Sequence, residues 1–174
     1  MTLVEVAAKA GLSHPFLSQL ERGLAQPSMG SLERIARALG SSQLELFAAA
    51  EDVIDAHSAD EVSLVRAGEG TQGPYAEGQG RLLVHGVRRF HPMEFIGDNR
   101  AAGDFYEHDE DEFLHVLEGE IELELDGAAT YTLGPGDSVY YKAGTLHRWS
   151  SPNGPYRLFI VKQSPQRLGN LEGT

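Results

Sequence analysis

The clearest pattern along the chain is a strict alternation of apolar and acidic residues between positions 120 and 126. Ile121, Leu123 and Leu125 alternate there with Glu120, Glu122, Glu124 and Asp126. A period of two is typical of a β-strand with one buried face and one face in water. Short runs of the same kind, bounded by turn residues, cover much of the chain from residue 62, at 62–67, 81–90, 112–119, 129–134, 137–144 and 155–162. Strands spaced this closely, with no helix between them, predict an antiparallel sandwich or barrel.

The first 48 residues follow a helical period instead. Leu3, Val6, Ala7 and Ala10 recur at three- and four-residue spacing, and Gly11 is expected to end that helix. A second helix is predicted to begin after Ser13 and to end at Gly23, because serine is a good N-cap and a proline follows in the first turn. We expect a third helix up to Gly40 and a short fourth over 42–47. Two short helices joined by a turn predict a helix-turn-helix.

The change from a helical to a strand-like period of apolar residues divides the chain into domains. Residues 49–62 are acidic and rich in alanine, with no sustained apolar stripe, so we interpret them as a linker. We therefore predict a small all-α domain over 1–48, an all-β domain over 63–166 and a tail over 167–174. The glycines at 68–73 match a GxGxxG pattern, but Pro74 follows where a nucleotide-binding motif needs a helix, so we expect a loop.

Charge limits where a nucleic acid could bind. The chain has a net charge of −12, whereas residues 1–48 hold four basic and four acidic side chains. Phosphate contacts supply most nucleic-acid affinity, so any role in DNA binding must rest on this neutral head, doubled by dimerisation. The absence of cysteine excludes disulfides, thiolate nucleophiles and cysteine-based zinc sites. No long apolar run or leader stands out, so we expect a cytoplasmic protein without a membrane partner.

The segment VAAKAGLSHPFLSQLERGLAQPSMGSLERIARALG, residues 6–40, resembles the DNA-binding domain of the XRE (lambda-repressor-like) family. Its Ala7, Gly11, Leu17, Pro27 and the ERG at 21–23 match the family pattern. The family has one more helix ahead of this point, so we expect a head without its first helix. The resemblance implies that the second helix here reads the major groove of a palindromic operator, through Ser13, His14, Pro15, Ser18 and Gln19. The alternative is that these polar residues are only a solvated helix face.

The β-rich part resembles the cupin fold, a double-stranded β-helix or jelly-roll barrel. His108, Glu112 and Gly119 match the second half of the first cupin motif, with Tyr106 in place of its first histidine. Gly136, Gly144 and His147 match the second motif, with Lys142 in place of its proline. The resemblance implies a metal site made of His108, Glu112 and His147, which suits Fe(II) and would also accept Mn, Ni or Zn. The alternative is a cage that has lost its metal and holds only water or hydrogen bonds.

An effector pocket is expected beside this cage. Trp149 shares strand parity with His147, so it should line the same cavity, and Tyr106 should also point inward. Tyr141 and Arg81 are further candidates for holding a small ligand, with Arg88 and Arg89 as alternatives to Arg81. His115 has the opposite parity to Glu112 and is predicted to face away from the cage.

Two functions use the same residues. The first is a homodimeric transcription regulator without catalytic residues, whose cupin domain senses a small metabolite, with or without a bound metal. The alternative is a non-haem Fe(II) oxygenase, since the metal spacing is similar to that of the phosphonate epoxidases, which combine a helical head with a cupin. A third possible function is that of a non-catalytic cupin for storage or protein interaction. The good match of the recognition helix to repressors favours the regulator.

Overall fold

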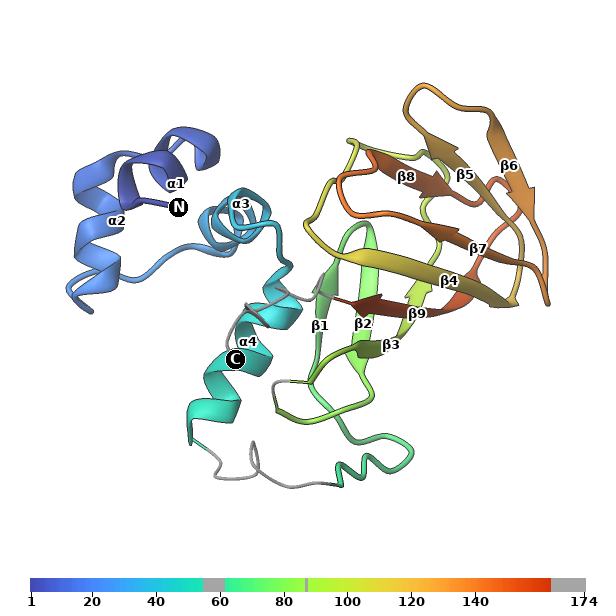
Figure 1. Cartoon of the computed structure of the whole chain (residues 1–174), viewed down its shortest axis with the longest axis horizontal. Coiled ribbons are helices and arrows are strands. Elements are labelled where there is room, and N and C mark those ends of the chain that lie inside the picture. The colour runs from blue at the N-terminus through green and yellow to red at the C-terminus, as the bar shows by residue number, and fades with distance from the viewer. Residues whose placement is uncertain (55–61, 87, 164–174) are drawn as a thin grey trace, which may run out of the picture.

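The computed structural model describes residues 1–54, 62–86 and 88–163 and places a helical head beside a β-domain (Figure 1). The head contains α1 (Leu3–Ala10), α2 (His14–Glu21), α3 (Met29–Ala38) and α4 (Gln43–Ile54). This confirms the predicted two-domain arrangement of an α-helical head and a β-rich domain. None of the helices in the described ranges is long and apolar enough to cross a membrane.

The predicted linker is wrong in its first part. Helix α4 continues to Ile54, six residues past the expected boundary at 48. The cause is local, because alanine-rich sequence without glycine or proline favours helix continuation. The remainder of the linker, 55–61, and the tail over 167–174 lie outside the described residues.

The short helices of the head begin at side-chain caps. Ser13 accepts a hydrogen bond from the Phe16 backbone N–H at the start of α2, and Ser28 does the same for α3. Between α1 and α2, Gly11 has a φ of +59°, a left-handed conformation that favours glycine. A small core of Val6, Ala7, Ala10, Leu17 and Ala38 holds the helices together.

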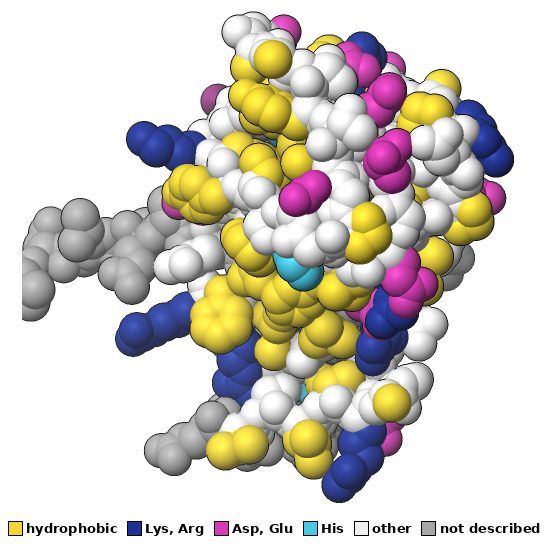
Figure 2. Space-filling model, turned by 90° about the vertical axis from the view of Figure 1, so that its right-hand side faces the viewer, with side chains coloured by type: hydrophobic (Ala, Val, Ile, Leu, Met, Phe, Trp, Pro, Cys, Tyr) yellow, Lys and Arg dark blue, Asp and Glu magenta, His cyan; other side chains and the backbone are white. Residues whose placement is uncertain are grey.

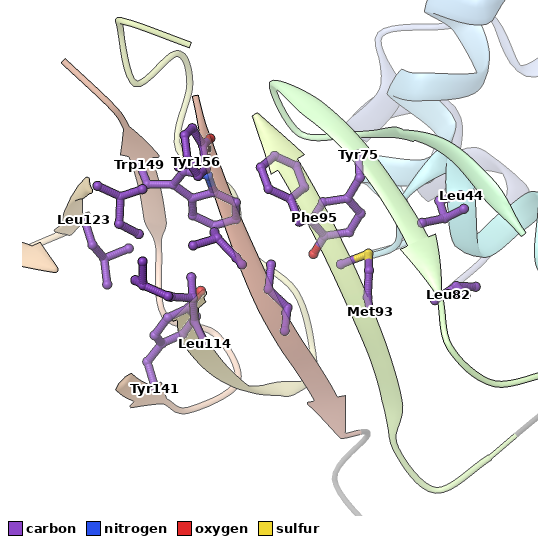
Figure 3. Close-up of a cluster of buried hydrophobic side chains, with 14 residues drawn as sticks. Leu44, Tyr75, Leu82, Met93, Phe95, Leu114, Leu123, Tyr141, Trp149 and Tyr156 are labelled. Carbon is purple, nitrogen blue, oxygen red and sulfur yellow. Dashed lines mark hydrogen bonds between the residues drawn. The ribbon is translucent and has the colours of Figure 1, made fainter. Parts of the chain in front are cut away.

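The β-domain has two antiparallel sheets. The larger has the strand order β1-β2-β3-β9-β4-β7 and the smaller the order β6-β5-β8. The strands are β1 (Gln72–Tyr75), β2 (Gly78–Leu82), β3 (His91–Gly97), β4 (Asp111–Glu118), β5 (Ile121–Leu125), β6 (Thr130–Leu133), β7 (Ser138–Tyr141), β8 (His147–Ser150) and β9 (Tyr156–Gln163). Apolar side chains from both sheets form one core between them, as expected for a cupin barrel (Figure 3).

Helix α4 fastens the head to the β-domain. Its Leu44 is fully buried in the barrel core, next to β1 and β2 (Figure 3). Gly80 in β2 makes this approach possible, since a Cβ at that position would lie 2.6 Å from Leu44 Cδ2 and 2.8 Å from Met93 Sδ. A bulkier residue at position 80 would therefore push the helix off the sheet.

Candidate metal and ligand site

Three potential metal ligands meet inside the barrel. His108 lies just before β4, Glu112 is in β4 and His147 begins β8. Alternation along β4 turns Glu112, Leu114 and Val116 inward, and His147 comes from the facing smaller sheet. All three are buried, and their nearest ligand atoms lie within 4.8 Å of one another. This places the predicted cage residues together.

The hydrogen bonds of the two histidines leave one nitrogen of each facing the cage. His108 Nδ1 lies 2.9 Å from the Glu110 carbonyl, and His147 Nδ1 lies 2.8 Å from the Thr145 carbonyl. A carbonyl only accepts, so both Nδ1 atoms donate, and Nε2 of each ring is left as the potential ligand. His108 Nε2 lies 2.9 Å from Glu112 Oε2. Two groups that both accept need a proton or a metal cation between them.

The charge states suit metal binding. Burial alone would raise the pKa of Glu112, but the hydrogen-bonding contact with His108 and the nearby His147 and Lys162 lower it to about 2. The Tyr141 hydroxyl donates to the other oxygen of the same carboxylate. Burial lowers the pKa of His147 and outweighs the opposite effect of Glu112. At neutral pH the cage therefore offers a carboxylate and a neutral imidazole, the forms that bind metals.

A buried lysine adjoins the cage. Lys162 of β9 pairs in register with Glu112 of β4, and only 3% of its surface is exposed. Its Nζ lies 3.2 Å from Glu45 Oε1 of α4, 3.7 Å from Glu110 Oε2 and 5.0 Å from the centre of the Tyr75 ring. Burial lowers the pKa of Lys162, but Tyr75 and these carboxylates raise it well above its ordinary value.

This part of the barrel therefore contains more negative than positive charge. Within the described ranges, three carboxylates, of Glu45, Glu110 and Glu112, lie around the ammonium of Lys162. A divalent cation held by His108, Glu112 and His147 would balance the excess. The donor set and the local charge both fit a first-row transition metal.

A cavity of about 300 Å³ opens beside the cage, between the head and the barrel. This volume is at the lower end of the range for small-molecule pockets, roughly 300–1,000 Å³. The head contributes Lys9, Glu33, Arg37 and residues 38–42, and the barrel contributes Tyr75, Tyr106, His108, His147, Trp149 and Lys162 among others. Helix α3 and the turn after it thus form one wall of the pocket, opposite the potential metal ligands.

Arg37 of α3 joins the head to the cage through Tyr106. Its guanidinium lies 4.1 Å from the centre of the Tyr106 ring, and its Nη2 lies 2.5 Å from the tyrosine hydroxyl. The backbone of Tyr106 exchanges two hydrogen bonds with His147, of 2.8 and 2.9 Å. A residue of the helical head is thus one side chain away from a potential metal ligand.

The predicted pocket residues divide into three groups. Trp149 and Tyr106 line the cavity as predicted, and the Trp149 ring is nearly parallel to that of His147, with centroids 6.0 Å apart. Tyr141 does not line the cavity, since it is buried behind Glu112. The prediction for Arg81 is wrong, since it does not line the cavity: it lies in β2 opposite Glu94, with Nη2 2.5 Å from the Glu94 carboxylate. His115 faces away from the cage, as predicted, and its Nδ1 lies 2.8 Å from Ser138 Oγ.

The predicted DNA-contact residues all lie on α2 or at its start. His14, Pro15 and Gln19 are exposed, while Ser18 is half-buried. The hydroxyl of Ser13 is engaged as the helix cap. Figure 1 shows α2 on the side of the head that faces away from the barrel. The helix is therefore free to approach a DNA groove without hindrance from the β-domain.

Comparison with known proteins agrees with the two-domain reading. The family described as helix-turn-helix matches residues 1–46, and the family described as cupin domain matches residues 93–162. The HTH-type transcriptional regulator PuuR of Escherichia coli is 25% identical over 163 residues, which cover 91% of this chain and 84% of PuuR. Both domains of this chain therefore align with one curated regulator.

Solved structures share the same arrangement. An HTH_3 family transcriptional regulator from Vibrio cholerae has a TM-score of 0.60 at 19% identity, over 95% of this chain and 88% of its own. Apo-HppE has a TM-score of 0.50 at 21% identity, over 92% of this chain and 89% of its own. These likenesses concern the fold. The family matches give the chain an XRE-like helix-turn-helix domain and a C-terminal cupin domain, and over both domains it is similar to a helix-turn-helix transcriptional regulator.

Proposed function

We propose that α2 reads operator DNA and that a small molecule in the cavity between head and barrel changes the affinity for that DNA. The observation that carries this proposal is the cavity itself, since its walls come from both domains. A ligand there touches the DNA-binding head and the cage at once. It can therefore bind unequally to two placements of the head, which is the condition for allosteric control.

A divalent metal, Fe, Mn, Ni or Zn, is the second part of the proposal. His108, Glu112 and His147 would hold it, supported by the orientation of the two imidazoles and by the excess of carboxylates around Lys162. Three protein ligands leave open positions on such an ion, where it acts as a Lewis acid toward an oxygen donor of the ligand.

The third part is a homodimer on a palindromic operator. One helix-turn-helix head reads only a half-site, so a two-fold operator requires a pair of heads. Figure 2 shows the face of the barrel turned away from the head, where apolar side chains gather in the centre and charged ones lie around them. Such a surface supports association between barrels, which would leave both heads free.

Fluorescence anisotropy with a labelled fragment of the protein's own promoter region tests DNA binding. We expect saturable binding to this fragment and at least roughly hundredfold weaker binding to a scrambled fragment, because specific sites exceed non-specific ones by a wide margin. Equal binding to both fragments would contradict a sequence-reading role. Elemental analysis of the purified protein, alongside His147→Ala, tests the metal separately.

The cage geometry also favours a second candidate, an Fe(II)-dependent oxygenase, because two histidines and one carboxylate suit this chemistry. The test is O₂ consumption by protein loaded anaerobically with Fe(II), with His147→Ala as the control. Substrate-dependent O₂ uptake that disappears in the variant would support the enzyme. DNA binding without any O₂ uptake supports the regulator.

A further inference from the structure

We propose that the ligand of the interdomain cavity is a small carboxylate and that Arg37, a residue of the DNA-binding head, binds its anionic group. This inference rests on the proposed function and adds the chemical class of the effector and the residue that recognises it. The carboxylate would bridge α3 and the barrel. Binding would then alter how the head is held, without a separate relay between the two domains.

The present partners of Arg37 leave it available for such a ligand. Its Nε lies 3.1 Å from Glu33 Oε1 on the same helix, and its Nη2 contacts the neutral hydroxyl of Tyr106. Its Nη1 only approaches Asp104 at 3.6 Å, and the Asp104 side chain is 86% exposed. Exposed pairs of this kind contribute little, so an enclosed carboxylate could displace Asp104 at low cost. A guanidinium edge matches a carboxylate with two parallel hydrogen bonds.

The positions of the charged side chains on the cavity wall also favour an anionic ligand. Two acidic residues on the wall, Glu107 and Asp109, are exposed at its rim, and the third, Glu33, is paired with Arg37. Lys9 of α1 adds a cation on the same side as Arg37. An anionic group entering from solvent therefore meets Arg37 and Lys9 on the head. The size of the cavity, about 300 Å³, limits the ligand to a small metabolite.

Trp149 supplies a direct readout of the cavity. It is the single tryptophan of the chain, and it lines the pocket against His147. Full-length protein, metal-free and Zn²⁺-loaded, would be titrated with succinate, 2-oxoglutarate and citrate. Succinamide serves as the uncharged match and 1,4-diaminobutane as the cationic match. We expect a saturable change of fluorescence with at least one carboxylate and none with the amide.

Two substitutions at the same contact separate ligand binding from a structural role. Arg37→Gln should weaken carboxylate binding at least roughly tenfold, because a charge-assisted contact is lost. Tyr106→Phe removes the hydroxyl that competes for Arg37, so the carboxylate affinity should rise. If Arg37 only held the head in place, both variants would weaken binding alike. Arg34→Gln removes the same charge from an exposed position of α3 outside the cavity and should leave the carboxylate affinity unchanged.

Circular dichroism checks that each variant is folded. If Arg37→Gln does not fold, Arg37→Lys carries the test, with a severalfold weaker affinity expected because lysine lacks the planar fork. Unchanged affinity in the Arg37 variants, binding of the diamine alone, or binding of none of the three carboxylates would overturn the inference. The proposed function stands or falls separately, by whether the ligand-free protein binds its promoter fragment.

Discussion

At the scale of single residues, the cage is defined by the groups that orient it. Each histidine is fixed by a backbone carbonyl two residues away, and Glu112 is fixed by His108 and Tyr141. Because the side chains are already held in place, metal binding costs little conformational entropy to order them. Removing one ligand should therefore affect metal binding far more than removing a histidine that lies outside the cage.

Metal removal provides the first prediction. Chelation should lower the melting temperature, and adding back Zn²⁺ or Mn²⁺ should restore it, since an ion at 100 times its Kd adds about 2.7 kcal/mol. His147→Ala should abolish this response, as measured by differential scanning fluorimetry with and without chelator. His115→Ala is the matched control, because its side chain bonds Ser138 outside the cage. A response retained in His147→Ala would place the ion elsewhere.

Acid stability provides the second prediction. The pKa of Glu112 in the folded protein is about 2, below its ordinary value of 4.5, so its contribution to stability is present above pH 4.5 and is lost as the pH falls toward 2. Glu112→Gln should flatten the dependence of unfolding free energy on pH over this window in metal-free protein. Urea denaturation at several pH values measures it. Glu122→Gln, which removes an exposed carboxylate of β5, should leave the slope as in the wild type.

At the scale of elements, the sequence predicted the strands with regular alternation. Strands β4 to β7 and β9 agree with predicted runs to within one residue, and β4, β5 and β9 alternate between buried and more exposed positions. The expected strand at 62–67 does not form, and the run at 81–90 covers only the end of β2 before a bend. No predicted run covers β1, β3, β8 or the first part of β2. In β1 and β2, Gly73, Pro74, Gly78 and Gly80 replace the apolar alternation where α4 and the neighbouring strands pack closely.

The same limit applies to the site. Motif spacing predicted His108, Glu112 and His147, but Arg37 and Tyr106 are 69 residues apart, and no local pattern joins them. The sequence indicates only weakly that Lys162 is buried, because it continues the inward series of Tyr156, Leu158 and Ile160 in β9. A charged residue at the end of a buried series indicates a buried partner. Its identity, Glu45 of α4, depends on how the domains pack.

The pair of Lys162 and Glu45 gives the third prediction. Lys162→Met should destabilise the fold by about 3–5 kcal/mol, because the carboxylates around it lose their counter-charge in a buried place. Glu45→Gln made in the same background should recover part of that loss, as a double-mutant cycle in urea would measure. Arg148→Met is the control, since its pair with Glu124 is partly exposed and should be worth about 1 kcal/mol or less. Equal effects at both sites would contradict a buried role for Lys162.

Helix α2 gives the fourth prediction, in which stability and DNA binding separate. Ser13→Ala should cost about 1 kcal/mol of stability through loss of the N-cap. Gln19→Ala should leave stability unchanged, because the side chain is exposed, but should weaken operator binding by about 1–3 kcal/mol. Thermal unfolding and anisotropy measure the two effects. Loss of stability in Gln19→Ala, or full operator affinity, would argue against its place at the DNA.

At the scale of the whole molecule, the charges are arranged so that few cations are available for DNA. The chain carries −12, and the head, residues 1–54, holds only Lys9, Arg22, Arg34 and Arg37 as basic residues against six acidic ones. Lys9 and Arg37 line the interdomain cavity, on the side toward the barrel. Arg22 and Arg34 are exposed and remain as the head's cations for phosphate contacts.

This leads to the fifth prediction, a shallow dependence of DNA affinity on salt. Two cations in each head of a dimer make four phosphate contacts, and each contact releases counterions from the DNA. Each contributes about −0.9 to the slope of log K against log salt concentration, so the expected slope is about −4. Anisotropy with the promoter fragment at several salt concentrations measures this slope. Arg34→Gln should make it shallower by about 2 in the dimer, whereas Arg37→Gln should leave it unchanged. A slope near about −7, or one that Arg37→Gln reduces, would mean that the cavity side of the head also meets DNA. The pocket and the operator would then compete for the same surface, and ligand binding would act by exclusion instead of by placing the head.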